Sequence, residues 1–179
     1  MLKALEEHHA SAFTWCLHCC RGDRFEAEDV LQTVYLKVLQ GRARFSGQSA
    51  FRTWLFAVIR LTAREGRRAM TRWLRRGALS LGMSVATDAA TTPLDSLRAQ
   101  EGIRRIERLL AGLSARQRDV LRLVFCHDLT IQEAAQVMGV TLGSARVHYE
   151  RGKERLRKAL DRHDIGERSG SGRSTAAAL

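Results

Sequence analysis

The side chains best suited to binding chemistry lie near the carboxyl end of the chain, on one predicted helix. Basic residues recur there between positions 146 and 158: Arg146, Arg151, Lys153, Arg155, Arg157 and Lys158. Guanidinium and ammonium groups bind DNA phosphates, and arginine also reads base edges in the major groove, which admits one helix. The pattern therefore indicates nucleic-acid binding.

A shorter helix and a turn precede this basic helix and predict how it is presented. Thr130 and Glu133 form a capping box that starts the shorter helix. Gly139 follows, where a helix end favours glycine, and Thr141 can cap the basic helix. Apolar positions of the basic helix recur at threes and fours and are predicted to face inward: Leu142, Ala145, Tyr149, Gly152 and Leu156. This is the organisation of a helix-turn-helix, with an ordinary helical hairpin as the alternative.

The composition of the chain sets limits on its class and its partners. The 179 residues carry a formal net charge of +11, which favours a polyanionic partner. Hydrophobic residues make up 45% of the chain, enough for cores, and the single proline favours helix. No apolar run approaches the ~20 residues of a membrane span, and the amino terminus lacks the pattern of a signal peptide. We expect a cytoplasmic protein without membrane insertion.

The hydrophobic pattern predicts an all-α fold of two small helical domains joined by a flexible linker. Helical spacing runs from 2 to about 21, from 25 to 39 and from 51 to about 72, with helix breaks at Gly22 and Gly41. Residues 1–76 are therefore predicted to form the first domain. Residues 77–93 are small, polar and almost uncharged, as in a linker. Helical pattern resumes near Leu94, Ser114 can cap a further helix, and the second domain spans 94–164. Residues 165–179 are predicted to be a disordered tail.

Two segments of the first domain, taken with the helix-turn-helix, carry a family resemblance. They read AEDVLQTVYLKVL (27–39) and FSGQSAFRTWLFAVIR (45–60). With them the chain resembles bacterial sigma factors of the extracytoplasmic-function type, group IV of the sigma-70 family. The resemblance implies that 1–76 is sigma region 2 and 94–164 is sigma region 4. It also implies binding to core RNA polymerase and promoter DNA, with no enzymatic activity and no cofactor.

For the first domain, the resemblance implies contacts with polymerase and with the minus-ten element. The clamp coiled coil of the largest polymerase subunit would bind Asp29, Gln32 and Lys37. The loop 45–50 and the helix after it would open the DNA, using Phe45, Gln48, Ser49, Arg52, Trp54, Arg60 and Arg64. Unpaired bases need planar surfaces to stack on and cations for their phosphates, although Trp54 could instead belong to the core.

For the second domain, the resemblance implies recognition of the minus-thirty-five element. The residues that match are Arg116, Arg146, Val147, His148, Glu150 and Arg151. Gly152 stands where the family usually has alanine, and we expect it to cost about 1 kcal/mol of helix stability. Many members of the family are held inactive by an anti-sigma factor, which is a further possible partner.

Two other functions compete with this interpretation. A stand-alone helix-turn-helix regulator would bind duplex DNA by itself, but it would leave the FRTWL segment unexplained. A nuclease would need clustered carboxylates for a metal, and Glu26, Glu28 and Asp29 have no partner cluster.

A group of cysteines and histidines near the amino terminus leaves a further question open. It comprises His8, His9, Cys16, His18, Cys19 and Cys20. These residues could begin a metal or redox site, but free cysteines more often fill a core. The paired C-x-x-C elements of structural zinc sites are missing, so we expect no bound metal.

Overall fold

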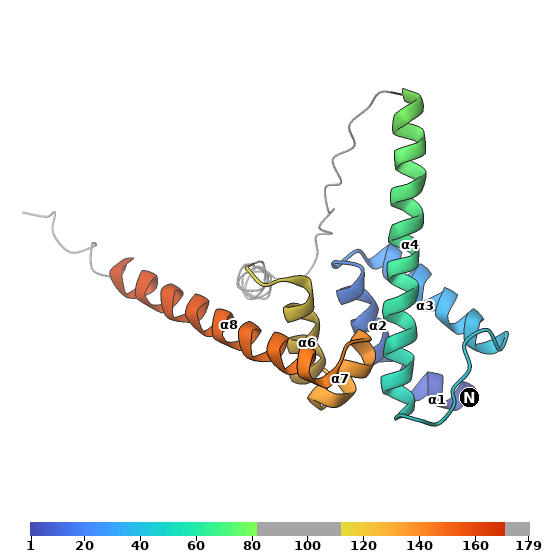
Figure 1. Ribbon diagram of the computed structural model, residues 1–179, viewed down its shortest axis with the longest axis horizontal. Coiled ribbons are helices and arrows are strands. Elements are labelled where there is room, and N and C mark those ends of the chain that lie inside the picture. Colours follow the sequence, from blue (N-terminus) through green and yellow to red (C-terminus); the bar gives the residue numbers. More distant parts are fainter. Residues whose placement is uncertain (82–111, 171–179) are drawn as a thin grey trace, which may run out of the picture. The chain divides into compact units, whose positions relative to one another are not determined.

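The computed structural model describes residues 1–81 and 112–170, and all regular secondary structure within these ranges is helical (Figure 1). This confirms the all-α prediction. The chain divides into two compact units: Met1–Leu94 with Glu133–Gly139, and Asp95–Gln132 with Val140–Leu179. None of the helices in the described part of the chain combines the length and the apolar character that a membrane span requires.

The first unit is built on α1 (Leu2–Glu7), α2 (His9–Cys19), α3 (Arg24–Leu39) and α4 (Phe51–Leu81). Helices α2, α3 and α4 pack against one another around a core that contains Trp15. The Trp15 indole is fully buried, stacks on the Phe56 ring with centroids 5.8 Å apart, and donates a hydrogen bond from Nε1 to the Phe56 carbonyl oxygen at 3.0 Å. The one polar atom of this indole is therefore satisfied, as burial requires.

Left-handed residues and one side-chain cap define the ends of α3. Arg21 and Gly22 have φ values of 58° and 89°, and Asp23 then caps α3 by accepting the Glu26 amide at 3.0 Å. At the other end, Gly41 follows the helix with a φ of 69°. The predicted helix breaks at Gly22 and Gly41 are confirmed, because these positions need a backbone conformation that glycine adopts without a Cβ clash.

Three helix boundaries differ from those predicted. The helix expected over 2–21 is interrupted at His8, which separates α1 from α2. Helix α4 continues through Gly77 to Leu81, into the segment expected to be linker, because Leu, Arg and Ala support helix there and the chain's one proline comes only at Pro93. Helix α8 likewise runs to Gly170, past the expected start of the tail. The rest of the linker, the helical pattern from Leu94 and residues 171–179 lie outside the described residues.

In the second unit, α6 (Ala115–Phe125) packs on α8 (Leu142–Gly170). Ser114 and Gln117 form a capping box at the start of α6, as Ser114 was predicted to do. Leu113 and Leu121 are buried between the two helices, and two partly buried side chains of α8 pack against them, Tyr149 and Leu156.

Helix α7 (Ile131–Met138) and the turn after it also follow the sequence prediction. Gly139 has a φ of 64°, and its amide donates to the Gln136 carbonyl oxygen at 3.1 Å. The Thr141 hydroxyl oxygen then accepts the Ser144 amide at 3.2 Å and caps α8. The left-handed glycine and the threonine cap of the helix-turn-helix are therefore confirmed.

Two large apolar residues that fit the helical spacing are exposed. Leu36 lies on the outer side of α3 with 50% of its surface exposed, and Phe125 ends α6 with 59% exposed. The Phe125 ring stacks on the Tyr149 ring instead, with centroids 5.9 Å apart. Both positions fit helical spacing, but the neighbouring helices leave them uncovered.

Candidate nucleic-acid interface

Three aromatic rings surround the point where the 45–50 loop enters α4. Phe45 meets Phe51 edge to face with centroids 5.4 Å apart, and Trp54 lies 5.3 Å from each of them. All three side chains are half-buried, so they rest on one another and still show part of their surface to solvent. Trp54 is therefore part of this cluster rather than part of the fully buried core.

The polar residues of the loop lie between Phe45 and Phe51 in the chain. Gly47 turns the chain with a φ of 74°, and Gln48 is exposed directly after it. Ser49 is half-buried, and its hydroxyl donates to the Ala50 carbonyl oxygen at 3.3 Å. The loop thus offers an exposed amide, with both donor and acceptor atoms, on the short segment between the Phe45 and Phe51 rings.

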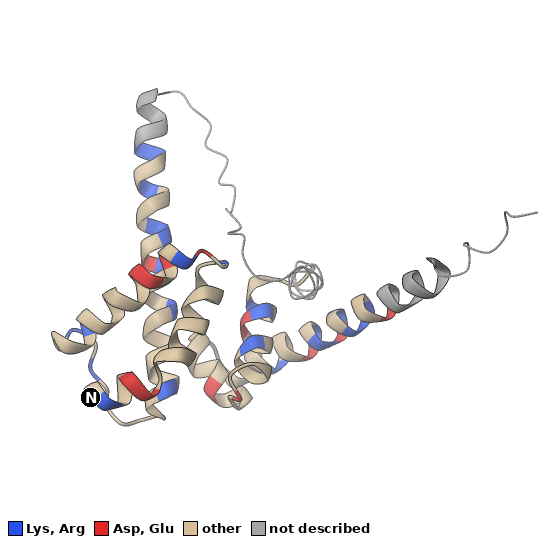
Figure 2. Ribbon diagram, turned by 180° about the vertical axis from the view of Figure 1, so that it is seen from behind, with Lys and Arg blue, Asp and Glu red and all other residues tan. Residues whose placement is uncertain are grey.

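Helix α4 carries a long series of arginines away from the loop (Figure 2). Arg52 and Arg60 are half-buried, and the exposed members are Arg64, Arg68, Arg72, Arg75 and Arg76. Arg67 has a structural role, because its Nη1 donates to the Cys19 carbonyl oxygen and lies 3.9 Å from a Glu26 carboxylate oxygen. Burial raises the pKa of the Glu26 carboxyl, and the charge of Arg67 partly offsets this effect.

The three residues of α3 expected to bind polymerase differ in their exposure to solvent. Asp29 and Gln32 are exposed, and Asp29 lines an open groove of about 1030 Å³ between α3 and α4. Lys37 is half-buried and joins the two helices, since its Nζ donates to Thr62 Oγ1 at 3.1 Å and to Glu65 Oε2 at 2.9 Å. The lysine ammonium is therefore engaged within the unit.

Helix α8 brings together most of the residues expected to read duplex DNA. Arg146, Glu150 and Arg151 are exposed, 46% of Val147 is exposed, and His148 is half-buried. The Glu150 carboxylate lies 3.8 Å from the Lys153 ammonium, a surface pair that solvent weakens. The remaining residue expected in this set, Arg116, is exposed in the first turn of α6. Figure 2 shows basic residues distributed along α8.

Comparison with known proteins decides the family. Residues 4–78 match Sigma-70 region 2, and residues 103–156 match Sigma-70, region 4. The chain is an extracytoplasmic-function sigma factor. As a sigma factor, it binds core RNA polymerase and promoter DNA and directs promoter recognition.

Individual relatives agree with this assignment over most of their length. The ECF RNA polymerase sigma factor SigX of Bacillus subtilis (strain 168) is 26% identical over 158 residues, which cover 87% of this chain and 81% of that protein. The RNA polymerase sigma factor CarQ of Myxococcus xanthus is 29% identical over 135 residues, covering 75% of this chain and 74% of that protein.

Two solved structures share the fold of this sigma factor. The sigma factor RpoE from Bartonella quintana, solved with the anti-sigma factor NepR, has a TM-score of 0.65 at 21% identity and covers 89% of this chain and 95% of that one. CnrH, solved with the cytosolic domain of CnrY, has a TM-score of 0.61 at 18% identity and covers 89% of this chain and 86% of that one.

Supporting contacts beneath the α8 surface were not predicted from the sequence. Lys153 Nζ lies 5.3 Å from the centre of the Tyr149 ring, and Arg155 Nη1 donates to Gln117 Oε1 at 3.3 Å. Arg155 of this sigma factor therefore ties α8 to α6, whereas the Lys153 contact lies within α8. No local sequence signal distinguishes these two basic side chains from the exposed Arg146 and Arg151.

The cysteines of the first unit belong largely to its core. Cys16 and Cys20 are buried, and burial is the main cause that raises the pKa of each thiol to about 12. His9 Nδ1 lies 3.0 Å from the Tyr35 hydroxyl oxygen. Among the residues whose structure is described, no three His, Cys, Asp or Glu side chains form a group that could hold a metal ion.

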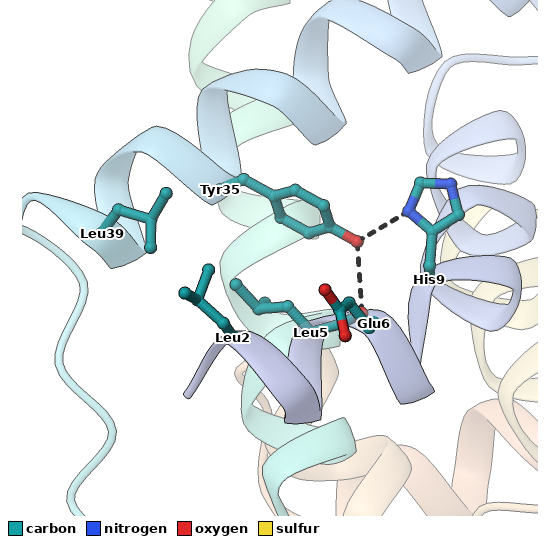
Figure 3. A pocket seen from close by; sticks show the side chains of 6 residues that line it. All are labelled: Leu2, Leu5, Glu6, His9, Tyr35 and Leu39. Carbon is teal, nitrogen blue, oxygen red and sulfur yellow. Dashed lines mark hydrogen bonds between the residues drawn. The ribbon is translucent and has the colours of Figure 1, made fainter.

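A small pocket of about 350 Å³ lies where α1 and α2 meet α3 (Figure 3). Its lining residues are Leu2, Leu5, Glu6, His9, Tyr35 and Leu39. Tyr35 projects across it, and its hydroxyl meets His9 of α2 and the Leu5 carbonyl oxygen of α1, the latter at 3.5 Å (Figure 3). At this pocket, Tyr35 of α3 therefore contacts both α1 and α2.

Proposed function

We propose that this sigma factor opens the minus-ten element by holding an unpaired base of the non-template strand at the loop 45–50. The observation that carries the proposal is the half-buried cluster of Phe45, Phe51 and Trp54 beside the exposed Gln48. Aromatic rings give an unstacked base a surface, and the Gln48 amide can pair with its polar edge. Together they would lower the free energy of the open strand relative to the duplex.

The arginines of α4 would stabilise the strand that the loop captures. Each exposed guanidinium on this helix can bind a phosphate and release its counterions, and Arg64 and Arg68 lie on the helix that starts at the loop. Arg67 is left out of this track because its Nη1 binds the Cys19 carbonyl oxygen. Opening would then be driven by binding energy alone, so we assign the protein no enzymatic reaction and no cofactor.

Recognition of the minus-thirty-five element is assigned to α8. Arg146 and Arg151 present exposed guanidinium groups, and Val147 offers an apolar surface to a thymine methyl group. His148 and Glu150 lie between Val147 and Arg151 and would take part in the same contact, and Arg116 of α6 would bind a phosphate at the edge of the element.

Binding to core polymerase is assigned to the exposed side of α3. Asp29 and Gln32 are placed to meet the clamp coiled coil, whereas Lys37 would act by holding α3 against α4 through Glu65 and Thr62. Since polymerase and promoter are its partners, we infer that the protein works in the cytoplasm. The neighbours solved with NepR and CnrY support an anti-sigma factor as a further partner.

The decisive test removes the polar groups of the loop and leaves its rings in place. The Gln48→Ala, Ser49→Ala double variant is combined with core polymerase on a promoter selected by transcription from a sequence library. We expect unchanged affinity for polymerase and a sharp fall in permanganate reactivity of the unpaired thymines. Gln40→Ala, a change of the same amide type at an exposed position outside the loop, is the matched control. Normal opening by the double variant would reduce the loop to a structural turn.

A further inference from the structure

His8 lies at the break between α1 and α2, and the backbone there is fixed. Its φ of −102° and ψ of 5° end α1, and its amide donates to the Ala4 carbonyl oxygen at 3.3 Å. Its own carbonyl oxygen accepts the Ala12 amide at 2.8 Å and the Ser11 hydroxyl at 3.0 Å. With both backbone groups engaged, the side chain leaves the break in a defined direction.

Contacts from α3 hold both sides of the break. The Tyr35 hydroxyl donates to the Leu5 carbonyl oxygen in α1 and lies 3.0 Å from Nδ1 of His9 in α2 (Figure 3). Leu5 is itself buried. The residues before and after His8 are thus tied to the same tyrosine, which restricts how the two helices can turn about the break.

The His8 ring ends on the aromatic cluster at the start of α4. It stacks on Phe51 with centroids 5.9 Å apart and planes 21° from parallel. Phe51 in turn lies 5.4 Å from Phe45 and 5.3 Å from Trp54. Four rings therefore run in contact from the break between α1 and α2 to the two ends of the loop 45–50.

We propose that His8 is a positioning residue for promoter opening, acting through Phe51 on the loop 45–50. This inference rests on the proposed role of that loop in holding an unpaired base. Phe51 is half-buried, and the His8 ring packs against it in an offset stack. Without that ring, Phe51 would sample more side-chain conformations, and the loop would have to be ordered at the moment it captures the base. The imidazole is used here as a flat ring, so its charge state does not enter.

The test compares His8→Ala, which removes the ring, with His8→Phe, which keeps a planar ring at the same position. Each full-length variant is bound to core polymerase, and opening is followed by permanganate reactivity on the selected promoter. We expect His8→Ala to lower the extent of opening by roughly twofold to tenfold, as the loss of one aromatic contact implies. His8→Phe should restore opening. Affinity for core polymerase should be the same for all three proteins.

Three results would overturn the inference. They are normal opening by His8→Ala, failure of His8→Phe to restore opening, and a parallel loss of polymerase affinity in His8→Ala that would indicate general disruption of the domain. Thermal unfolding followed by circular dichroism checks that each variant is folded. The Gln48→Ala, Ser49→Ala variant separates the two proposals. If that variant fails to open DNA while His8→Ala opens it normally, only the role of His8 is lost.

Discussion

Gly152 of α8 lies against Leu121 of α6 so closely that a Cβ atom on the glycine would stand 3.1 Å from Leu121 Cδ1. The same Cβ would also lie 3.3 Å from the Cβ of Gln117, and Gly152 itself is buried. The sequence indicated only that a glycine within a helix costs about 1 kcal/mol of stability. The structure adds a gain that offsets this cost, because the missing side chain lets α8 approach α6. This approach helps to position the preceding turns of α8, which carry the residues that we propose read DNA.

Substitution of Gly152 should therefore depend steeply on side-chain size. Gly152→Ala gains helix propensity but crowds Leu121, so we expect its free energy of unfolding to stay within about 1 kcal/mol of the native value. Gly152→Leu should destabilise the second domain by roughly 1–3 kcal/mol, the usual cost of overpacking. Chemical denaturation measures both values. Equal stability of the leucine variant would show that the close approach of α6 and α8 is unimportant.

Replacing the two exposed polar residues of α3 should weaken polymerase binding without unfolding the first domain. The Asp29→Ala, Gln32→Ala variant should bind core polymerase more weakly because it lacks the two side chains assigned to the clamp contact. The domain should stay folded, since both side chains are exposed and contribute nothing to the core. Fluorescence anisotropy with labelled sigma factor gives the affinity. Glu28→Ala, which removes the exposed partner of Arg24 on the same helix, is the control. An unaltered affinity in the double variant would move the polymerase contact elsewhere.

Arg151→Ala should distinguish base reading from phosphate binding on α8. If the guanidinium reads a base, we expect a loss of about 1–3 kcal/mol on the preferred minus-thirty-five sequence and little effect on a scrambled one. If it only touches phosphate, both sequences should lose affinity alike and the salt dependence should become shallower. Arg157→Ala, an exposed arginine farther along the same helix, is the comparison. No effect on either sequence would mean that this face of α8 does not meet DNA.

The buried thiols should make the first domain sensitive to alkaline pH. Burial is the main cause that raises the pKa of Cys16 and of Cys20 from 9.0 to about 12. Between these two values the folded chain keeps thiol protons that the unfolded chain releases. The free energy of unfolding is therefore unaffected by ionisation of these thiols below pH 9, and it falls as the pH rises from 9 towards 12. Thermal unfolding across this range should show a steeper loss in the native protein than in a Cys16→Ala, Cys20→Ala variant. Identical slopes would mean that the thiols ionise alike in both states.

Local sequence signals predicted much of this fold because they act over a few residues. Ser114 caps α6, Thr141 caps α8, and the glycines at 22, 41 and 139 have positive φ values, each as its position in the pattern indicated. The prediction failed where a local signal was weak, since Gly77 does not end α4 and His8 does interrupt a helix that the apolar pattern runs through.

The candidate site was predicted as a set of residues but not as an arrangement. Asp29 and Gln32 are exposed on α3. Lys37 instead donates hydrogen bonds to Glu65 and Thr62 of α4, although nothing in the sequence distinguishes it from an exposed lysine. The neighbouring helix decides which of several similar side chains forms contacts within the protein. The spacing of residues in the sequence does not contain that information.

By itself the sequence determined the helices, their caps, the turn of the helix-turn-helix and the family, because these follow from side-chain chemistry at short and regular spacing. Only the tertiary structure decided that the His8 ring stacks against Phe51 and that Leu121 packs against Gly152. Both contacts join residues far apart in the chain. They exist because helices with their own local preferences pack at one particular distance and rotation, and that geometry is fixed by the whole core rather than by any one segment.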